Sequence, residues 1–576
     1  MTNVGRIVAV SGPLITAAFD RPVIQNEVGY AVVDGLRLKA ELIRVRGQYA
    51  DLQVFEDTVG LFVGGRVEFT GEMLAAELGP GLLGLVVDGL QNPLPELAAE
   101  AGYFLPRGTY LAPLDRTRRW AWTPKAAVGD AVRAGDTLGV VPEGEFQHRI
   151  MAPLGAGGWW TVREVAEAGE RTIDEVVAVI ADERGRTREV TMVQRWPVKV
   201  PIRAYRERLR PDAPLTTKIR IVDTLFPVAR GGTYCIPGPF GAGKTVLQQL
   251  TSRHAEVDVV VVAACGERAG EVVETLREFP EITDPRTGRS LMERTVIICN
   301  TSSMPVAARE ASVYTAVTIA EYYRQMGLDV LLLADSTSRW AQALREVSGR
   351  LEEIPGEEAF PAYLESVVAA FYERGGLVSL RDGTTGSVTI GGTVSPAGGN
   401  LEEPVTQATL KVVGAFHGLS RARSDARRYP AIDPLDSWSH YPGVVRADDV
   451  SFARRVLREG HEVAQMMKVV GEEGTSLDDF VRHLQAEYLD AAYLQQDAFD
   501  EVDGASSAER QADVFAELIG VLRARLRFDG KDAARRLFQD LTQATKEWNR
   551  CPWGSSEFDA GRERLRALVK EVGVGA

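Results

Sequence analysis

Residues 238–245 read Gly-Pro-Phe-Gly-Ala-Gly-Lys-Thr, and this stretch decides the fold around it. It fits the phosphate-loop pattern G-x-x-x-x-G-K-[ST] at every fixed position. Glycines let successive backbone N–H groups turn toward a triphosphate, and the dipole of the following helix reinforces them. The expected nucleotide-binding residues are Gly238, Pro239, Phe240, Gly241, Ala242, Gly243, Lys244, Thr245 and Val246.

The flanking sequence supports a phosphate loop over an ordinary Gly-rich turn. Residues 232–236 before it are typical of a short strand, and residues 246–254 after it favour a helix. Strand, loop and helix in this order are the arrangement that the pattern requires. Lys244 then reaches the β- and γ-phosphates, and the Thr245 hydroxyl ligates Mg²⁺. The sequence therefore predicts that the chain binds a nucleoside triphosphate.

Composition narrows the class of protein. The chain has 576 residues, which indicates several domains, and its 45% hydrophobic content is that of a folded globular protein. The net charge of −14 argues against nucleic acid as the main ligand. The first residues do not resemble a signal peptide, and the four scattered cysteines form no C-x-x-C pair. We expect a cytoplasmic location, with Cys235 and Cys265 as buried thiols near the loop.

The N-terminal part is rich in short strands. Apolar runs broken by Gly and Asp lie at 5–10, 29–33, 36–46, 50–56 and 65–70. This spacing predicts a β-barrel over residues 1–71, followed by a connector over 72–112. Residues 113–196 form a second β-rich unit, an insertion with the Gly-Asp turns of biotinyl and lipoyl carrier domains. Residues 149–153 offer no lysine to modify, so we expect a structural role.

Strands alternate with helices over residues 197–437, which predicts an α/β nucleotide-binding core with a mostly parallel sheet. Runs such as 258–265, 295–299 and 329–334 are apolar throughout, as strands covered on both faces are. Beyond them, amphipathic Pro-free segments at 452–470, 477–494, 508–526 and 533–548 predict a helical domain over residues 438–576. The fold class is therefore multidomain, with a barrel, an α/β core, a β-rich insertion and helices.

Two acidic residues follow predicted strands. Asp335 closes the strand at 330–334, where a carboxylate helps to hold magnesium. Ser336 follows it, so the glutamate that often orients the attacking water must come from elsewhere. Glu267 ends the strand after the phosphate-loop helix, on the carboxyl edge of the sheet where ligands bind. We expect Glu267 to polarise water, with Arg268 beside it; a surface ion pair is the alternative.

Further candidates carry less information. Arg339, four residues past Asp335, is a candidate for phosphate contact, and a salt bridge on a helix surface explains it equally well. Tyr429 and Phe499 are candidates to stack on adenine. Their spacing alone does not select them, because aromatic residues most often belong to a core.

Several motifs together resemble the catalytic A subunit of V-type/A-type rotary ATPases, nearly end to end. They include 226–232 (FPVARGG), 237–245 (PGPFGAGKT), 265–268 (CGER), 300–310 (NTSSMPVAARE), 334–340 (ADSTSRW), 394–396 (VSP), 403–407 (EPVTQ) and 495–499 (QQDAF). Residues 113–196 occupy the place of the insertion that separates this subunit from its F-type β counterpart. Lys218 departs from the family, which usually has Gly there, as do Ser366-Val367 and the region of Tyr429.

The resemblance implies a RecA-like catalytic subunit of a rotary ATPase. Mg-ATP hydrolysis or synthesis would be coupled to rotation and to transport of H⁺ or Na⁺. Three copies would alternate with three non-catalytic B subunits in an A3B3 ring. Central-stalk and peripheral-stalk subunits would connect the ring to a membrane sector, on the cytoplasmic face of the membrane. Glu267 would be the catalytic carboxylate, with Lys244, Arg268 and Arg339 at the phosphates and Tyr429 and Phe499 flanking the adenine.

Two other functional classes share parts of this pattern. A hexameric RNA translocase or a secretion ATPase has the same core, but neither needs the insertion, and the acidic charge counts against the first. A regulatory subunit of the same ring is expected to lack Lys244 or Glu267, and both are present.

Overall fold

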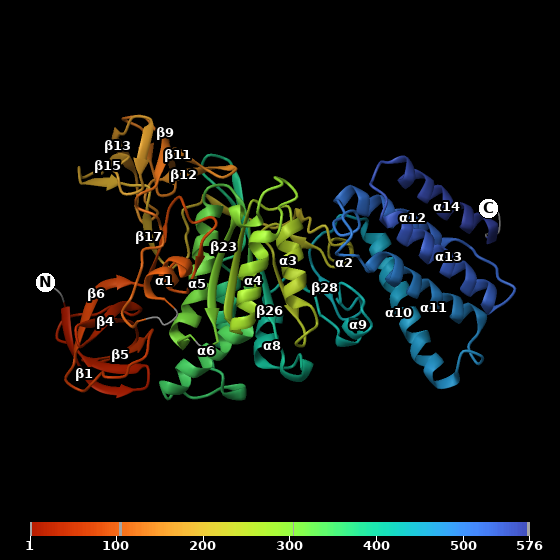
Figure 1. Ribbon diagram of the computed structural model, residues 1–576, viewed down its shortest axis with the longest axis horizontal. Helices are drawn as coiled ribbons and strands as arrows, with labels where there is room; N and C mark the ends of the chain where they lie inside the picture. Colours follow the sequence, from red (N-terminus) through yellow and green to blue (C-terminus); the bar gives the residue numbers. More distant parts are fainter. Residues whose placement is uncertain (1–2, 103–105, 303, 573–576) are drawn as a thin grey trace. The chain divides into compact units, whose positions relative to one another are not determined.

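The computed structural model describes residues 3–102, 106–302 and 304–572, drawn in Figure 1. Packing divides the chain into two compact units. Unit 1 comprises Met1–Arg210, Val257–Gly392 and Gln407–Thr409, and unit 2 comprises Pro211–Glu256, Thr393–Thr406 and Leu410–Ala576. This division is one of packing, and the five segments expected from the sequence stay a prediction.

Unit 1 begins with a closed barrel, red in Figure 1, in the strand order β1-β2-β5-β4-β3-β6. Alternation along each strand buries one set of side chains inside, with Ile7, Leu38 and Leu52 fully covered. The predicted barrel is confirmed, but the short strand β2 was not among the predicted strands. The strands are β1 (Asn3–Ser11), β2 (Leu14–Ala18), β3 (Glu27–Val33), β4 (Leu36–Arg46), β5 (Tyr49–Val54) and β6 (Arg66–Met73).

The insertion in unit 1 consists of two antiparallel sheets, ordered β10-β13-β15-β16 and β12-β11-β9-β14. A buried network ties it to α5 (Val306–Arg324), because His148 contacts Glu143 through Nδ1 (2.6 Å) and Tyr322 through Nε2 (2.9 Å). Its strands are β9 (Arg119–Pro124), β10 (Ala131–Val132), β11 (Thr137–Glu143), β12 (Phe146–Met151), β13 (Trp160–Val165), β14 (Gly169–Thr172), β15 (Ala178–Asp182) and β16 (Thr187–Val190). β17 (Gln194–Pro197) then pairs with β7 (Ala75–Leu78).

Unit 1 also contains parallel strands in the order β8-β23-β22-β24-β26. β22 is rich in Val and β24 in Leu, and both are mostly buried, as the apolar runs predicted. The strands are β8 (Val86–Val87), β18 (Glu207–Leu209), β22 (Val259–Glu267), β23 (Thr295–Thr301), β24 (Asp329–Asp335), β25 (Gly376–Ser379) and β26 (Thr385–Val394, its last two residues in unit 2). The helices are α1 (Leu94–Ala101), α4 (Ala269–Glu281), α5, α6 (Thr337–Arg350) and α7 (Leu364–Tyr372), with 3-10 turns η1 (Leu291–Arg294) and η2 (Glu357–Ala359).

Unit 2 holds the phosphate-loop segment and the C-terminal helices, blue in Figure 1. Its strands are β19 (Pro214–Leu215), β20 (Val228–Ala229), β21 (Thr233–Pro237), β27 (Ala415–Phe416) and β28 (Trp438–Ser439). Its helices are α2 (Arg220–Leu225), α3 (Lys244–His254), α9 (Arg421–Asp425), α10 (Ala447–Val470), α11 (Leu477–Leu489), α12 (Ala508–Arg523), α13 (Lys531–Asn549) and α14 (Ser556–Val572). η3 (Ala397–Gly399) precedes α8 (Pro404–Leu410), which has residues of both units.

The helical C-terminal part is confirmed, and α14 extends it beyond the predicted helices. Nearly half of the residues of this helix are charged, and it buries Phe558 and Leu565. Gly561 allows close approach to α13, since a Cβ there would lie 2.4 Å from the ring of Trp548. Among the described helices, none combines the length and the apolarity that crossing a bilayer requires.

Candidate functional site

The phosphate loop of unit 2 connects β21 to α3. Gly241 and Gly243 have φ angles of 79° and 90°, in the left-handed region where a side chain is disfavoured. They allow the chain to turn sharply before α3 begins at Lys244, which leaves the first N–H groups of the helix without intrahelical partners. The predicted strand, loop and helix are therefore present, and the loop ends in a group of donors suited to an anion.

Lys244 reaches back across the loop. Its Nζ donates hydrogen bonds to the carbonyl oxygens of Gly238 (2.8 Å) and Pro239 (3.1 Å). Thr245, in the first turn of α3, is exposed, so its hydroxyl is accessible to a ligand. Phe240 and Val246 are also exposed, at 70% and 46%.

A cavity of about 530 Å³ opens beside the start of α3, within unit 2. The phosphate loop contributes Gly241, Ala242, Gly243 and Val246 to its wall, and both predicted aromatic residues, Tyr429 and Phe499, line it. Phe499 is fully exposed, whereas Tyr429 is half-buried. Burial raises the pKa of the Tyr429 phenol, and within the described residues its hydroxyl has no hydrogen-bond partner. The tertiary structure thus brings residues from distant segments to one cavity.

The far wall of the cavity follows a π-helical turn, Asp490–Leu494, at the end of α11. π-helical turns occur often at functional sites. Asp490 holds the neighbouring segment, because it accepts hydrogen bonds from both Nη atoms of Arg423 (2.8 Å each) and pairs with Arg428. The chain next runs through residues 495–506. They are called the base loop below, after the nucleobase that Phe499 is expected to contact.

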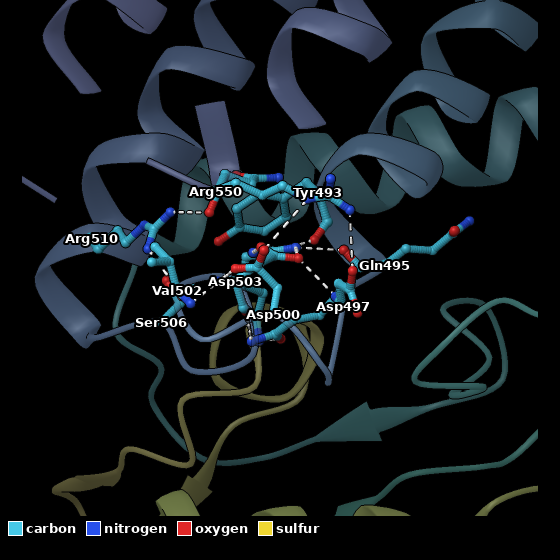
Figure 2. Close-up of polar contacts among 12 residues, drawn as sticks. Tyr493, Gln495, Asp497, Asp500, Val502, Asp503, Ser506, Arg510 and Arg550 are labelled. Atoms are coloured by element: carbon cyan, nitrogen blue, oxygen red, sulfur yellow. Dashed lines mark hydrogen bonds and ion pairs between the residues drawn. The ribbon is translucent and has the colours of Figure 1, made fainter. Parts of the chain in front are cut away.

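The base loop is held from the side of α13. Arg550 pairs with Asp497 (3.2 Å) and Asp500 (3.6 Å), and Figure 2 shows these side chains together. The backbone N–H of Gln496 donates to the carbonyl oxygen of Tyr429 (2.8 Å). Sequence reasoning did not select Gln496 or Arg550 as site residues. Gln496 lies within the 495–499 motif, whereas no local pattern marks Arg550.

The predicted carboxylates lie in unit 1. β22 and β24 are parallel neighbours, with Ala264 opposite Asp335. Glu267 and Asp335 therefore lie at the same edge of the sheet, as the strand pattern predicted. Burial of Glu267, together with the charge of Asp335 and a hydrogen bond and charge from Glu271, raises the pKa of Glu267 to about 8, against a smaller lowering by Arg339.

Gly266 explains how arginines approach this edge. Its φ is 79°, and a Cβ there would lie 3.1 Å from Cβ of Arg339 and 3.2 Å from Cδ of Arg309. Arg339 Nη1 donates to Gln342 Oε1 (3.2 Å). Arg268 precedes α4 and is exposed. The arrangement provides one carboxyl group that can hold a proton near neutral pH, next to arginine.

Among the described residues that line the cavity, and among the predicted carboxylates and arginines, there is no cysteine. Cys235, Cys265 and Cys299 are buried free thiols, and burial raises the pKa of Cys265 and of Cys299 to about 12. The expectation that Cys235 and Cys265 are buried thiols is confirmed.

Family models match the chain in four parts. Residues 218–439 match the nucleotide-binding domain of the ATP synthase alpha/beta family, and residues 7–71 match its beta-barrel domain. Residues 111–199 match the barrel-sandwich domain of ATP synthase alpha/beta subunits. Residues 449–527 match the C-terminal domain of V and A type ATP synthase.

Similar proteins match along almost the whole chain. The V-type ATP synthase alpha chain of Treponema denticola is 63% identical over 567 residues, which are 98% of this chain and 96% of that protein. The V-type ATP synthase alpha chain 1 of Treponema pallidum is 64% identical over 566 residues, with the same coverage. The V-type ATP synthase alpha chain of Borrelia turicatae is 60% identical over 566 residues, 98% of each chain.

Proposed function

Since this chain belongs to the family of V-type ATP synthase alpha chains, we propose that its phosphate loop and the adjoining cavity hold ATP or ADP. The chain is the catalytic subunit of a rotary ATPase, an enzyme that makes or hydrolyses ATP. One observation supports the assignment of the site above others: the 530 Å³ cavity begins at the first turn of α3 and is lined by Tyr429 and Phe499. A nucleotide whose base lies between these two aromatic residues would place its phosphates at the N-terminus of α3.

Lys244 and Thr245 are the residues proposed to bind the phosphates and the magnesium ion. The Lys244 ammonium, now bound to loop carbonyls, would exchange these partners for phosphate oxygens. Thr245 and Asp335 are the residues proposed to hold Mg²⁺, directly or through water. Each offers a donor that fits a hard cation, a hydroxyl in Thr245 and a carboxylate in Asp335. Within unit 1, the carboxyl charge of Asp335 and Glu271 beside Glu267 favours a cation at that sheet edge. When bound, Mg²⁺ would neutralise charge on the phosphates.

Glu267 is proposed to take the proton of the attacking water. A carboxyl group with a pKa of about 8 is largely protonated at neutral pH and must ionise before it acts as a base. Nearby positive charge lowers a carboxyl pKa, as Arg339 already does in part. Glu267 must therefore give up its own proton before it can accept one from water. Arg268 and Arg339 are proposed to contact the phosphates.

The chain is one subunit of a larger ATPase complex. We propose that three copies alternate with three non-catalytic B subunits in an A3B3 ring. Stalk subunits would transmit rotation to a membrane sector that moves H⁺ or Na⁺, with this chain peripheral on the cytoplasmic side. The resemblance of the motif string supports this arrangement.

Lys244→Ala tests the nucleotide site. Its loss removes the side-chain cation of the phosphate loop, so tight binding of Mg-ATP should disappear, by about 100-fold or more in Kd. Titration calorimetry on the purified chain measures it. Lys531→Ala is the matched control, because Lys531 lies at the start of α13 and donates to the carbonyl of Glu472. Wild-type affinity in Lys244→Ala would refute the assignment.

A further inference from the structure

Arg220 is a buried arginine at the start of α2, and its side chain reaches the base loop. Its Nε donates to the carbonyl oxygen of Tyr493 (2.7 Å), and Nη2 donates to that of Gln495. Its Nη1 forms an ion pair with Asp503. The guanidinium therefore bonds to Gln495 at the start of the base loop and to Asp503 within it, and Figure 2 labels Tyr493, Gln495 and Asp503.

The backbone around Arg220 adds further bonds to the same loop. Its own N–H donates to Gln496 Oε1 (2.9 Å). The carbonyl oxygen of Lys218 accepts from Gln496 Nε2 (3.0 Å) and from the N–H of Ser506 (3.0 Å). Residues 216–220 therefore form a support on which the base loop rests.

The same support holds the end of the phosphate-loop helix. The N–H of Glu256, two residues past α3, donates to the carbonyl oxygen of Thr216 (3.0 Å). One five-residue segment thus contacts both the helix that begins at the phosphates and the loop that lines the proposed base cavity. All of these residues belong to unit 2.

Phe499 gives these contacts a consequence. Its side chain is fully exposed, so packing does not fix its position, and the backbone of the base loop must do so. Within the loop, Asp503 Oδ2 accepts from the N–H of Asp497 (2.7 Å), and Asp500 Oδ1 accepts from the N–H of Val502 (2.9 Å) and of Asp503 (2.8 Å). Arg220 therefore pairs with the residue that closes the turn carrying Phe499.

We propose that Arg220 is a positioning residue for recognition of the nucleoside. It holds the base loop so that Phe499 can contact the base, and its influence falls on the base end of the ligand. Lysine cannot replace it, because the planar guanidinium donates in three directions at once, to two carbonyls and a carboxylate. The inference rests on the proposed function of the cavity as the base site.

The test compares two ligands that share phosphates and differ in the base. Calorimetry gives Kd for Mg-ATP and for magnesium tripolyphosphate in the wild-type chain, Arg220→Lys and Asp503→Asn. We expect both variants to weaken ATP binding by about tenfold or more, and to leave tripolyphosphate binding within about twofold. Phe499→Ala should show the same selective loss. Arg294→Lys, which alters a buried pair with Asp284 (2.6 Å) in unit 1, is the control.

The outcomes separate this inference from the function on which it rests. Equal weakening of both ligands would make Arg220 a support of the whole unit and overturn the inference. So would ATP affinity unchanged in Arg220→Lys. If the wild-type chain does not prefer ATP to tripolyphosphate, the cavity is not the base site and both proposals fall. Thermal unfolding checks that each variant is folded, and Asp503→Asn decides the test if Arg220→Lys does not fold.

Discussion

Lys218 has a backbone conformation that is unfavourable for a residue with a side chain. Its φ is 63°, in the left-handed region that favours glycine, and the resemblance to related subunits also leads one to expect glycine there. The conformation is held by bonds at both sides of the residue. The N–H of Lys218 donates to Asp223 Oδ2 (2.8 Å), and its carbonyl accepts from the base loop. The departure from the family pattern therefore leaves the backbone turn in place.

Lys218→Gly should keep this turn and relieve its strain. In the left-handed region, a residue other than glycine destabilises the folded state by roughly 1–2 kcal/mol. Glycine removes this strain but lowers stability by about 0.5–1 kcal/mol, because it gives the unfolded chain more conformational entropy. The expected net effect is a gain of about 0.5 kcal/mol in the free energy of unfolding. Urea unfolding of both proteins measures it. A loss of stability larger than about 1 kcal/mol would mean that the half-buried Lys218 side chain contributes more than its strain costs.

Glu267→Gln tests whether Glu267 is the general base that accepts the proton of water. The amide is nearly the same size but cannot accept a proton from water, so turnover should fall by at least about 100-fold while ATP still binds. Steady-state hydrolysis and ATP titration measure the two effects. Glu293→Gln is the control, since Glu293 lies on the surface in an ion pair with Arg289. Hydrolysis within about tenfold of wild type would show that another group is the base.

At the scale of elements, parallel strands and helix starts decide where chemistry can occur. The register of β22 with β24 brings Glu267 and Asp335 to one sheet edge, although 68 residues separate them in the sequence. α3 starts directly after two glycines of positive φ, and helix geometry gives its first N–H groups no acceptor within the helix. Neither feature needs an unusual side chain, because strand pairing and helix geometry alone create both positions.

His417, which follows strand β27, is expected to make the stability of the fold depend on pH. His417 is buried, its Nε2 lies 2.8 Å from the carbonyl oxygen of Phe226, and burial lowers its pKa to about 4. In the unfolded chain the pKa is about 6.5. The folded state binds fewer protons between these values, so this residue should cost stability as pH falls from about 6.5 to 4, by up to about 3 kcal/mol.

Comparison of His417→Gln with the wild type isolates this effect. Asp223 acts in the opposite direction, because burial raises its pKa to about 6, and its penalty disappears as pH falls. The difference between the two proteins cancels that contribution. Urea unfolding at pH 7 and pH 5 should show that the wild type loses more stability on acidification than the variant. Equal losses would mean that His417 is protonated in the folded state.

At the scale of the whole molecule, the proposed ring decides how fast the chain works alone. The resemblance to rotary ATPases implies that each catalytic site lies at a subunit boundary. Phosphoryl transfer gains about 10³–10⁵ in rate from an arginine finger. We therefore predict that the isolated chain binds ATP but hydrolyses it slowly, and that adding the B subunit raises turnover steeply. Equal turnover per site in the two preparations would make Arg268 or Arg339 the main source of positive charge.

The sequence by itself determined the phosphate loop, the parallel strands and the helical C-terminal part. These depend on local patterns: eight consecutive residues for the loop, continuous apolar runs for covered strands, and a helical period for α10 to α13. Among the elements that escaped prediction, β2 and α14 did so because their patterns are weak. β2 is short, and α14 is so charged that few of its residues mark a buried face.

Only the tertiary structure decided the rest of the site. The cavity combines the phosphate loop with segments near Tyr429, Phe499 and Arg550, and no local spacing connects residues so far apart. The raised pKa of Glu267 depends on burial and on carboxyl groups from other segments, which composition does not reveal. Arg220 reads as an ordinary charged residue until its guanidinium is seen bonded to the base loop. Local chemistry is written in consecutive residues, whereas burial and long-range pairing exist only once the chain has folded.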